Sequence, residues 1–164
     1  MLFSQAFSDL MVLEEGSPEG QPPWGITQSL LDSWAESKGI GHHDVMTLPR
    51  SIAIDFVEDE YWIPCGCGSL PDKLDFVVFQ ACYNLGQWHG ICLLQSAVGV
   101  TVDGIIGPIT LRAAKRAPLV ETCKMVLTYQ NRYYVQIENQ KNMIDEAGWH
   151  NRVTRTAKMV GITL

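Results

Sequence analysis

Apolar residues recur every three to four positions along most of this 164-residue chain, the spacing typical of α-helices with one buried face. The first helix should end near Gly16, because five glycines and prolines between residues 16 and 23 exclude regular structure there. Its apolar positions are Leu2, Phe3, Ala6, Phe7, Leu10, Met11 and Leu13. The pattern therefore predicts a helix that runs directly into a loop rich in glycine and proline.

Later stretches repeat the helical pattern with start and stop signals. Thr27 is placed to cap a helix from Gln28 to Lys38, and Gly39 is placed to end it. Further helices are expected over residues 47–62, 74–85, 88–97, 108–116, 119–140 and 149–160. Residues 39–46 show no period, and residues 22–26 are the one candidate for a short strand pairing. The expected fold class is mainly α.

A short glycine-rich segment, 65–71, divides the chain. It has no hydrophobic period and ends in Pro71, which is typical of a boundary between structural units. We therefore expect two helical lobes, residues 1–66 and residues 67–164, packed on one another. A chain of this length and 46% hydrophobic content can bury a sizeable core.

Charge and hydropathy exclude several classes of function. The net charge of -6 argues against a nucleic-acid-binding surface, which needs clustered lysine and arginine. No apolar run approaches the roughly 18 residues needed to cross a bilayer. The N-terminus lacks the basic start and unbroken apolar stretch of a signal peptide, so we expect synthesis in the cytoplasm.

The cysteines and histidines do not match a common metal site. Cys65 and Cys67 are separated by one residue, and no histidine follows at zinc-finger spacing. The nearby glycines lack a phosphate-binding lysine and a βαβ context. The odd number of cysteines suits unpaired thiols in a reducing compartment. The sequence therefore predicts neither a metal nor a cofactor.

Two carboxylates, Glu14 and Glu15, stand where the first helix gives way to its loop. Acidic side chains oppose the dipole at the C-terminal end of a helix, so helix stability alone does not account for them. Acids in this setting are candidates for acid/base chemistry, and Glu19 and Thr27 are the candidates for a second polar group. Glu19 is four residues from Glu15 and at most about 14 Å away along an extended chain. An exposed loop glutamate and a helix-capping threonine are the simpler structural interpretations of these two residues.

Six short motifs, taken together and in order, resemble glycoside hydrolase family 108. They are Leu13-Glu-Glu-Gly16, Trp24-Gly-Ile-Thr27, Tyr61-Trp62, Tyr83-Asn-Leu-Gly86, Leu94-Gln-Ser-Ala97 and Val102-Asp-Gly-Ile-Ile-Gly-Pro-Ile-Thr110. Members of that family are phage and bacterial N-acetylmuramidases. The resemblance implies a lysozyme-like catalytic lobe followed by a peptidoglycan-binding region, which Gly148-Trp-His-Asn-Arg-Val153 would close.

The resemblance selects Glu15 as the general acid, because Glu15 precedes Gly16 as the family's catalytic glutamate precedes its glycine. Glu14 remains the rival, since it lies closer to the helical face of Phe3, Phe7 and Leu10. Such an acid must stay protonated near neutral pH, which partial burial against apolar groups achieves. Here Ser17 replaces the family's second glycine and the following loop is shorter, which leaves the second catalytic group open between Glu19 and Thr27.

Aromatic faces and amide groups usually line a sugar-binding cleft. The candidates for substrate binding are Trp24, Tyr61, Trp62, Tyr83 and Asn84. Packing in the core is the alternative for each aromatic ring, and capping of a helix end is the alternative for Asn84. The basic residues of the last two helices either meet anionic cell-wall groups or form a solvated face; they are Arg132, Lys141, Arg152, Arg155 and Lys158.

The expected function is that of a monomeric muramidase, which hydrolyses the β-1,4 bond between N-acetylmuramic acid and N-acetylglucosamine in peptidoglycan. The resemblance suggests a phage endolysin or an exported cell-wall lytic effector that acts in the periplasm or cell wall. It would reach its substrate through a holin-like route or a dedicated secretion system. The alternatives are a lytic transglycosylase and a non-catalytic cell-wall-binding or virion protein.

Overall fold

The computed structural model describes residues 1–14, 24–141 and 148–164, and within these ranges all regular structure is helical. The mainly α prediction is therefore confirmed, and no strand pairing occurs in the described part of residues 22–26. The α-helices are α1 (Phe3–Glu14), α2 (Gln28–Lys38), α3 (Arg50–Val57), α4 (Leu74–Leu85), α5 (Gln87–Val98), α6 (Pro108–Arg116), α7 (Leu119–Lys141) and α8 (Gly148–Met159). The short helices are η1 (Val45–Thr47), η2 (Glu58–Trp62) and η3 (Cys67–Ser69).

The stop and start signals of α2 have different outcomes. Gly39 ends the helix in the left-handed region, with φ 66°, and its amide donates to the carbonyls of Ala35 and Glu36 as predicted. Thr27 stands at the N-cap position, but its side chain makes no capping hydrogen bond. Its hydroxyl lies 3.3 Å from the Ser29 hydroxyl instead, so Thr27 occupies the predicted N-cap position without a side-chain cap.

The helix expected over residues 47–62 begins later than predicted, at Arg50, and its last turn is π-helical. The α-helix begins at Arg50, after Pro49, and widens at residue 58 into the π-helical turn η2. There the amide of Ile63 donates to the carbonyl of Glu58, five residues earlier. The wider turn accompanies a core position for Trp62, whose ring lies 5.6 Å from Phe3 and 5.2 Å from Phe79.

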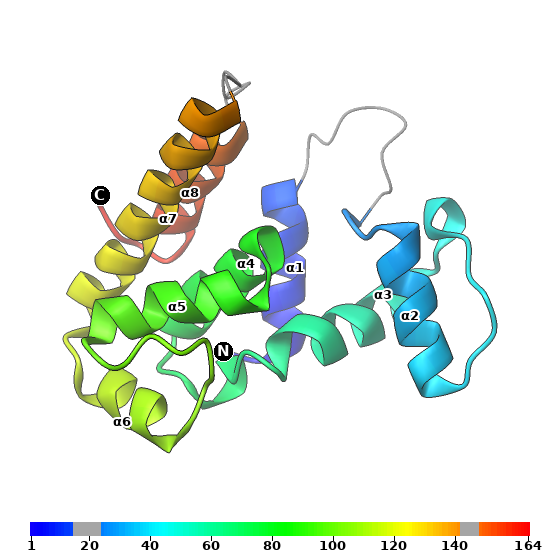
Figure 1. Ribbon diagram of the computed structural model, residues 1–164, viewed down its shortest axis with the longest axis horizontal. Coiled ribbons are helices and arrows are strands. Elements are labelled where there is room, and N and C mark those ends of the chain that lie inside the picture. The colour runs from blue at the N-terminus through cyan, green and yellow to red at the C-terminus, as the bar shows by residue number, and fades with distance from the viewer. Residues whose placement is uncertain (15–23, 142–147) are drawn as a thin grey trace.

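The helices lie on two sides of α1 (Figure 1). On one side α4, α5, α7 and α8 pack together, and we call these four helices the bundle. On the other side are α2, η1 and α3, which we call the arm. One continuous cluster of buried apolar side chains joins the two sides through α1. The division into lobes at residues 66 and 67 stays a prediction.

Two glutamines form a buried polar contact inside the bundle. Gln80 of α4 donates to the side-chain oxygen of Gln130 of α7 at 2.7 Å, and the Gln130 amide donates to the Tyr134 hydroxyl at 3.1 Å. Both glutamines are fully buried. Because a buried amide without a partner is costly, this pairing fixes how α4 and α7 lie against each other.

Candidate active site

The candidate site lies at the C-terminal end of α1, where the predicted acids begin. Ala6, Phe7, Leu10 and Leu13 bury one face of this helix, and Glu14 is its last residue. Glu15 and Glu19, predicted as general acid and second catalytic group, lie outside the residues that the structure describes. The described neighbourhood of the site is therefore built around Glu14 and the elements that contact it.

Glu14 forms an ion pair with Arg152 of α8. The Arg152 guanidinium donates to a carboxylate oxygen of Glu14 at 3.0 Å, and the two side chains are only 18% and 12% exposed. Burial chiefly raises the pKa of Tyr83 in α4, and the Glu14 carboxylate raises it further. Burial likewise raises the pKa of Tyr134 in α7, where Glu14 has the same effect and Arg152 opposes it. Glu14 therefore lies where α1 meets the bundle.

Arg155 contacts the same end of α1 through the backbone. Its guanidinium donates to the carbonyl of Leu13 at 3.3 Å and also to the carbonyl of Val12. Sequence reasoning treated Arg152 and Arg155 as a solvated face or as contacts for the cell wall. The structure places both against α1. Neither the spacing of the arginines nor their helix indicated this partner, because it lies some 140 residues earlier in the chain.

Three of the predicted sugar-binding aromatics come together beside α1. The Tyr83 hydroxyl donates to the carbonyl of Trp24, and the rings of Tyr83 and Tyr61 lie 5.0 Å apart. The ring of Trp24 packs 6.2 Å from Phe7, and its indole N–H donates to the carbonyl of Leu48 in the arm at 3.1 Å. All three rings are partly exposed. They therefore combine a fixed position with open surface, as a sugar platform requires.

Gly25 allows the close approach between Trp24 and Tyr83. Its φ is +66°, and an added Cβ would lie 3.2 Å from the Tyr83 hydroxyl. A residue with a side chain would be strained there by its backbone and would press on the tyrosine. The glycine of the Trp-Gly-Ile-Thr motif thus serves the packing of the aromatic group.

The other predicted residues lie elsewhere. Trp62 is 6% exposed and lies in the core between Phe3 and Phe79, which leaves little of its ring open to a ligand. Asn84 is partly exposed and donates to the carbonyl of Gln80, four residues earlier in α4, while Gly86 holds the C-cap position. Thr27 is exposed at the start of α2.

The loop between α5 and α6 is held by a buried side chain. The Gln95 side-chain oxygen accepts from the amides of Asp103 and Gly104, and its nitrogen donates to Asp103 and to the carbonyl of Ile105. The hydrogen bond from Gln95 is the main cause that lowers the pKa of Asp103. The Asp-Gly motif therefore forms a loop ordered by Gln95. Exposed apolar side chains surround it: Trp88, Val102, Ile105 and Ile109.

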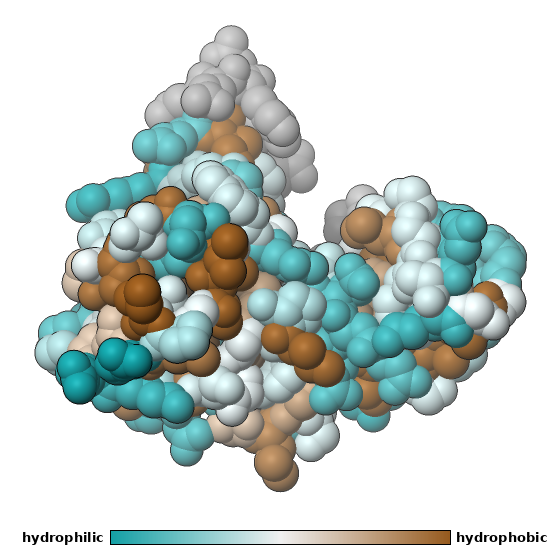
Figure 2. All heavy atoms as spheres, turned by 60° about the horizontal axis from the view of Figure 1, so that its bottom comes forward, coloured by the Kyte–Doolittle hydropathy of each residue, from teal (hydrophilic) through white to brown (hydrophobic). Residues whose placement is uncertain are grey.

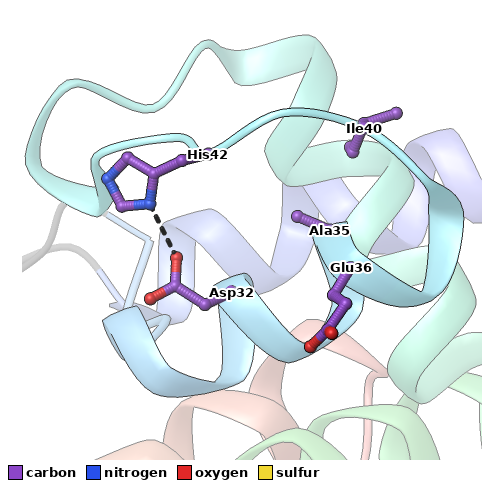
Figure 3. Close-up of a pocket in the computed structure, with 5 residues that line it drawn as sticks. All are labelled: Asp32, Ala35, Glu36, Ile40 and His42. Atoms are coloured by element: carbon purple, nitrogen blue, oxygen red, sulfur yellow. Dashed lines mark hydrogen bonds and ion pairs between the residues drawn. The ribbon is translucent and has the colours of Figure 1, made fainter.

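The face of the molecule in Figure 2 carries both hydrophilic and hydrophobic residues, and the hydrophobic residues gather on the larger of the two masses that this view shows. A separate surface pocket of about 300 Å³ lies on the arm, lined by Asp32, Ala35, Glu36, Ile40 and His42. His42 and Asp32 point toward one another there, with Nδ1 of the imidazole 3.0 Å from the carboxylate (Figure 3). None of the residues predicted for the site lines this pocket.

No group of potential metal ligands is found in residues 1–14, 24–141 and 148–164. The five cysteines are buried free thiols, and burial chiefly raises the pKa of Cys67 and of Cys82 well above the ordinary value. Cys67 and Cys82 therefore remain protonated, and protonated thiols are poor ligands or nucleophiles. Over the same described ranges, no helix has the length and apolar character needed to cross a membrane.

Comparison with known proteins gives two adjacent family matches. Residues 12–86 match the model of glycosyl hydrolase 108, and residues 89–154 match the model described as a predicted peptidoglycan domain. The structure of Brucella abortus SagA is similar to this one, with a TM-score of 0.72 and 24% sequence identity over 96% of this chain and 92% of that chain. This likeness supports the lysozyme-like helical fold expected from the sequence. No curated protein matches the sequence.

Proposed function

We propose that this protein is a peptidoglycan-degrading muramidase, because residues 12–86 match the model of glycosyl hydrolase 108 and residues 89–154 match that of a predicted peptidoglycan domain. It cleaves the β-1,4 bond between N-acetylmuramic acid and N-acetylglucosamine. Glu15 protonates the glycosidic oxygen, and a water molecule adds to the anomeric carbon of the muramic acid. The products are a new reducing muramic acid end and a free hydroxyl on the glucosamine.

The observation that carries this proposal is the environment of the end of α1. Glu14 already accepts a hydrogen bond from Arg152 and ties α1 to α8. Because Glu14 is engaged in this contact, we favour Glu15 as the proton donor. Glu15 is the next residue and is followed by Gly16. Trp24, Tyr61 and Tyr83 lie together beside α1 and supply aromatic faces for the sugar rings. Glu19 and Thr27 remain the candidates for the group that directs the water.

We also propose where the enzyme acts. Its substrate is the glycan of the bacterial cell wall, and the region matched to the peptidoglycan domain retains the protein on that polymer. A phage endolysin or an exported lytic effector fits this activity. We also propose that the protein acts as a monomer.

Mass spectrometry of the fragments released from purified peptidoglycan tests the reaction. A muramidase releases fragments with reducing N-acetylmuramic acid ends, which carry one water more than the anhydro ends made by a lytic transglycosylase. Fragments with anhydro ends would show that the protein is a lytic transglycosylase and not a hydrolase. Binding of sacculi without release of fragments would show a cell-wall-binding protein instead. Heat-denatured protein provides the control for spontaneous release.

A further inference from the structure

The last turn of α1 is held from outside the catalytic region by α8. Arg152 and Arg155 stand one turn apart on α8, so they point from the same face of the helix. Arg152 binds the carboxylate of Glu14, and Arg155 binds the carbonyls of Val12 and Leu13. The last carbonyls of an α-helix have no partner within that helix, and here one guanidinium satisfies two of them.

The arginines project from a helix that is itself anchored. Val153, Thr156 and Ala157 bury one side of α8. Trp149 stacks on Tyr134 of α7, with ring centroids 5.1 Å apart and an interplanar angle of 25°. Tyr134 in turn accepts a hydrogen bond from the buried Gln130. The helix that carries Arg152 and Arg155 is therefore anchored to the rest of the bundle through a continuous series of contacts.

We infer that Arg155 and Arg152 are positioning residues of the muramidase site, which fix the end of α1 from which the chain continues into Glu15. This inference rests on the proposed function. It gives α8 a part in the chemistry of a site whose proposed acid lies near the other end of the chain. The matched peptidoglycan domain ends at residue 154, so Arg152 lies inside it and Arg155 just beyond it.

The chemistry of arginine fits this role. Its planar fork presents several donors in a fixed arrangement, so one side chain can bind two neighbouring carbonyls at once. Its positive charge also stabilises the negative end of the helix dipole. Turnover depends steeply on geometry, since a displacement of about 1 Å can lower the rate about 100-fold. Loss of the contacts between the arginines and α1 should therefore lower kcat more than it weakens the binding of peptidoglycan.

The test compares Arg155→Met, Arg155→Lys and the matched control Lys158→Ala in the full chain. Methionine keeps most of the side-chain length and removes the donors, lysine keeps a charged donor, and Lys158 is an exposed residue of the same helix. Release of reducing ends from solubilised peptidoglycan strands gives kcat and KM. Sedimentation with intact sacculi measures binding. All assays are run well below the melting temperature of each variant.

We expect Arg155→Met to lower kcat at least about tenfold while KM and sacculus binding change less than about threefold. Arg155→Lys should restore part of kcat, and Lys158→Ala should match the wild type. A wild-type kcat in Arg155→Met would overturn the inference, as would a loss of sacculus binding at unchanged kcat. If Arg155→Met does not fold, Arg152→Gln gives the same comparison, and a wild-type kcat there also overturns it. A wild-type protein that releases no fragments would instead refute the proposed function.

Discussion

The bundle and the arm are both held by glutamine side chains, but these differ in burial. In the bundle, Gln80 and Gln130 bond to each other between α4 and α7 and are fully buried. In the arm, Gln28 of α2 is only partly buried; it donates to the carbonyl of His43 at 2.8 Å and accepts from the amide of Val45 at 2.9 Å. Water can replace the second set of partners and not the first. The arm should therefore open at a lower free energy than the bundle.

The two sides contribute different residues to the proposed site. The bundle supplies Tyr83 and, through α8, the arginines that hold α1. The arm contacts Trp24, whose indole N–H donates a hydrogen bond to the carbonyl of Leu48.

The largest expected effect comes from breaking the buried amide pair. Gln130→Ala removes the hydrogen bonds that join Gln130 to Gln80 and Tyr134 and opens a cavity, so the free energy of unfolding should fall by about 3 kcal/mol. Denaturant titration measures the change. Gln136→Ala, an exposed glutamine on the same helix, serves as the control and should change stability by less than about 0.5 kcal/mol. Equal effects of the two variants would contradict the role given to the pair.

Breaking the matching contact in the arm should cost less. Gln28→Ala removes two hydrogen bonds to the segment from His43 to Val45, but the freed backbone groups can bind water. The free energy of unfolding should fall by about 1 kcal/mol. The same titration measures it. A loss as large as that of Gln130→Ala would abolish the contrast between arm and bundle.

The smallest expected effect concerns the ion pair at the end of α2. The Lys38 ammonium lies 2.7 Å from Asp59, and its hydrogen bond is the main cause that lowers the pKa of Asp59, with the Trp34 indole as a further donor. Lys38→Gln should cost less than about 1 kcal/mol of unfolding free energy at neutral pH, because the pair is partly exposed. A carboxyl group with a lowered pKa stabilises the fold only while it is ionised. The difference in unfolding free energy between the wild type and Lys38→Gln should therefore vanish as the pH falls through the pKa of folded Asp59. Thermal melting of both proteins at neutral and acidic pH measures it, and a difference that persists in acid would contradict this origin.

Local signals predicted most of the helices. The bounds of α2 and α6 follow from periodicity, Gly39 and Pro108, since each signal acts within one turn of the helix it limits. The π-helical turn η2 was missed because Val57 and Tyr61 keep an ordinary four-residue helical spacing across its start. The hydrogen bond from Ile63 to Glu58 and the packing of Trp62 between Phe3 and Phe79 distinguish the wider turn.

Contacts between distant segments limited the prediction of the site. Sequence motifs suggested Trp24, Tyr61 and Tyr83, and the structure brings these three together. They also suggested Trp62, which lies in the core, because exposure depends on the whole fold. Nothing local marked Arg152 and Arg155 as partners of α1. The polar group of His150 with Asn131 and Glu138 was missed for the same reason.

Release of reducing ends from peptidoglycan by Glu15→Gln and Glu14→Gln tests the central claim most directly. Removal of a general acid lowers turnover by about 10² to 10⁴-fold, so we predict that Glu15→Gln is essentially inactive and melts like the wild type. Glu14→Gln should keep measurable activity and melt at a lower temperature, because it breaks the ion pair with Arg152. Full activity in Glu15→Gln, or inactivity in a stably folded Glu14→Gln alone, would contradict the assignment of Glu15 as the acid.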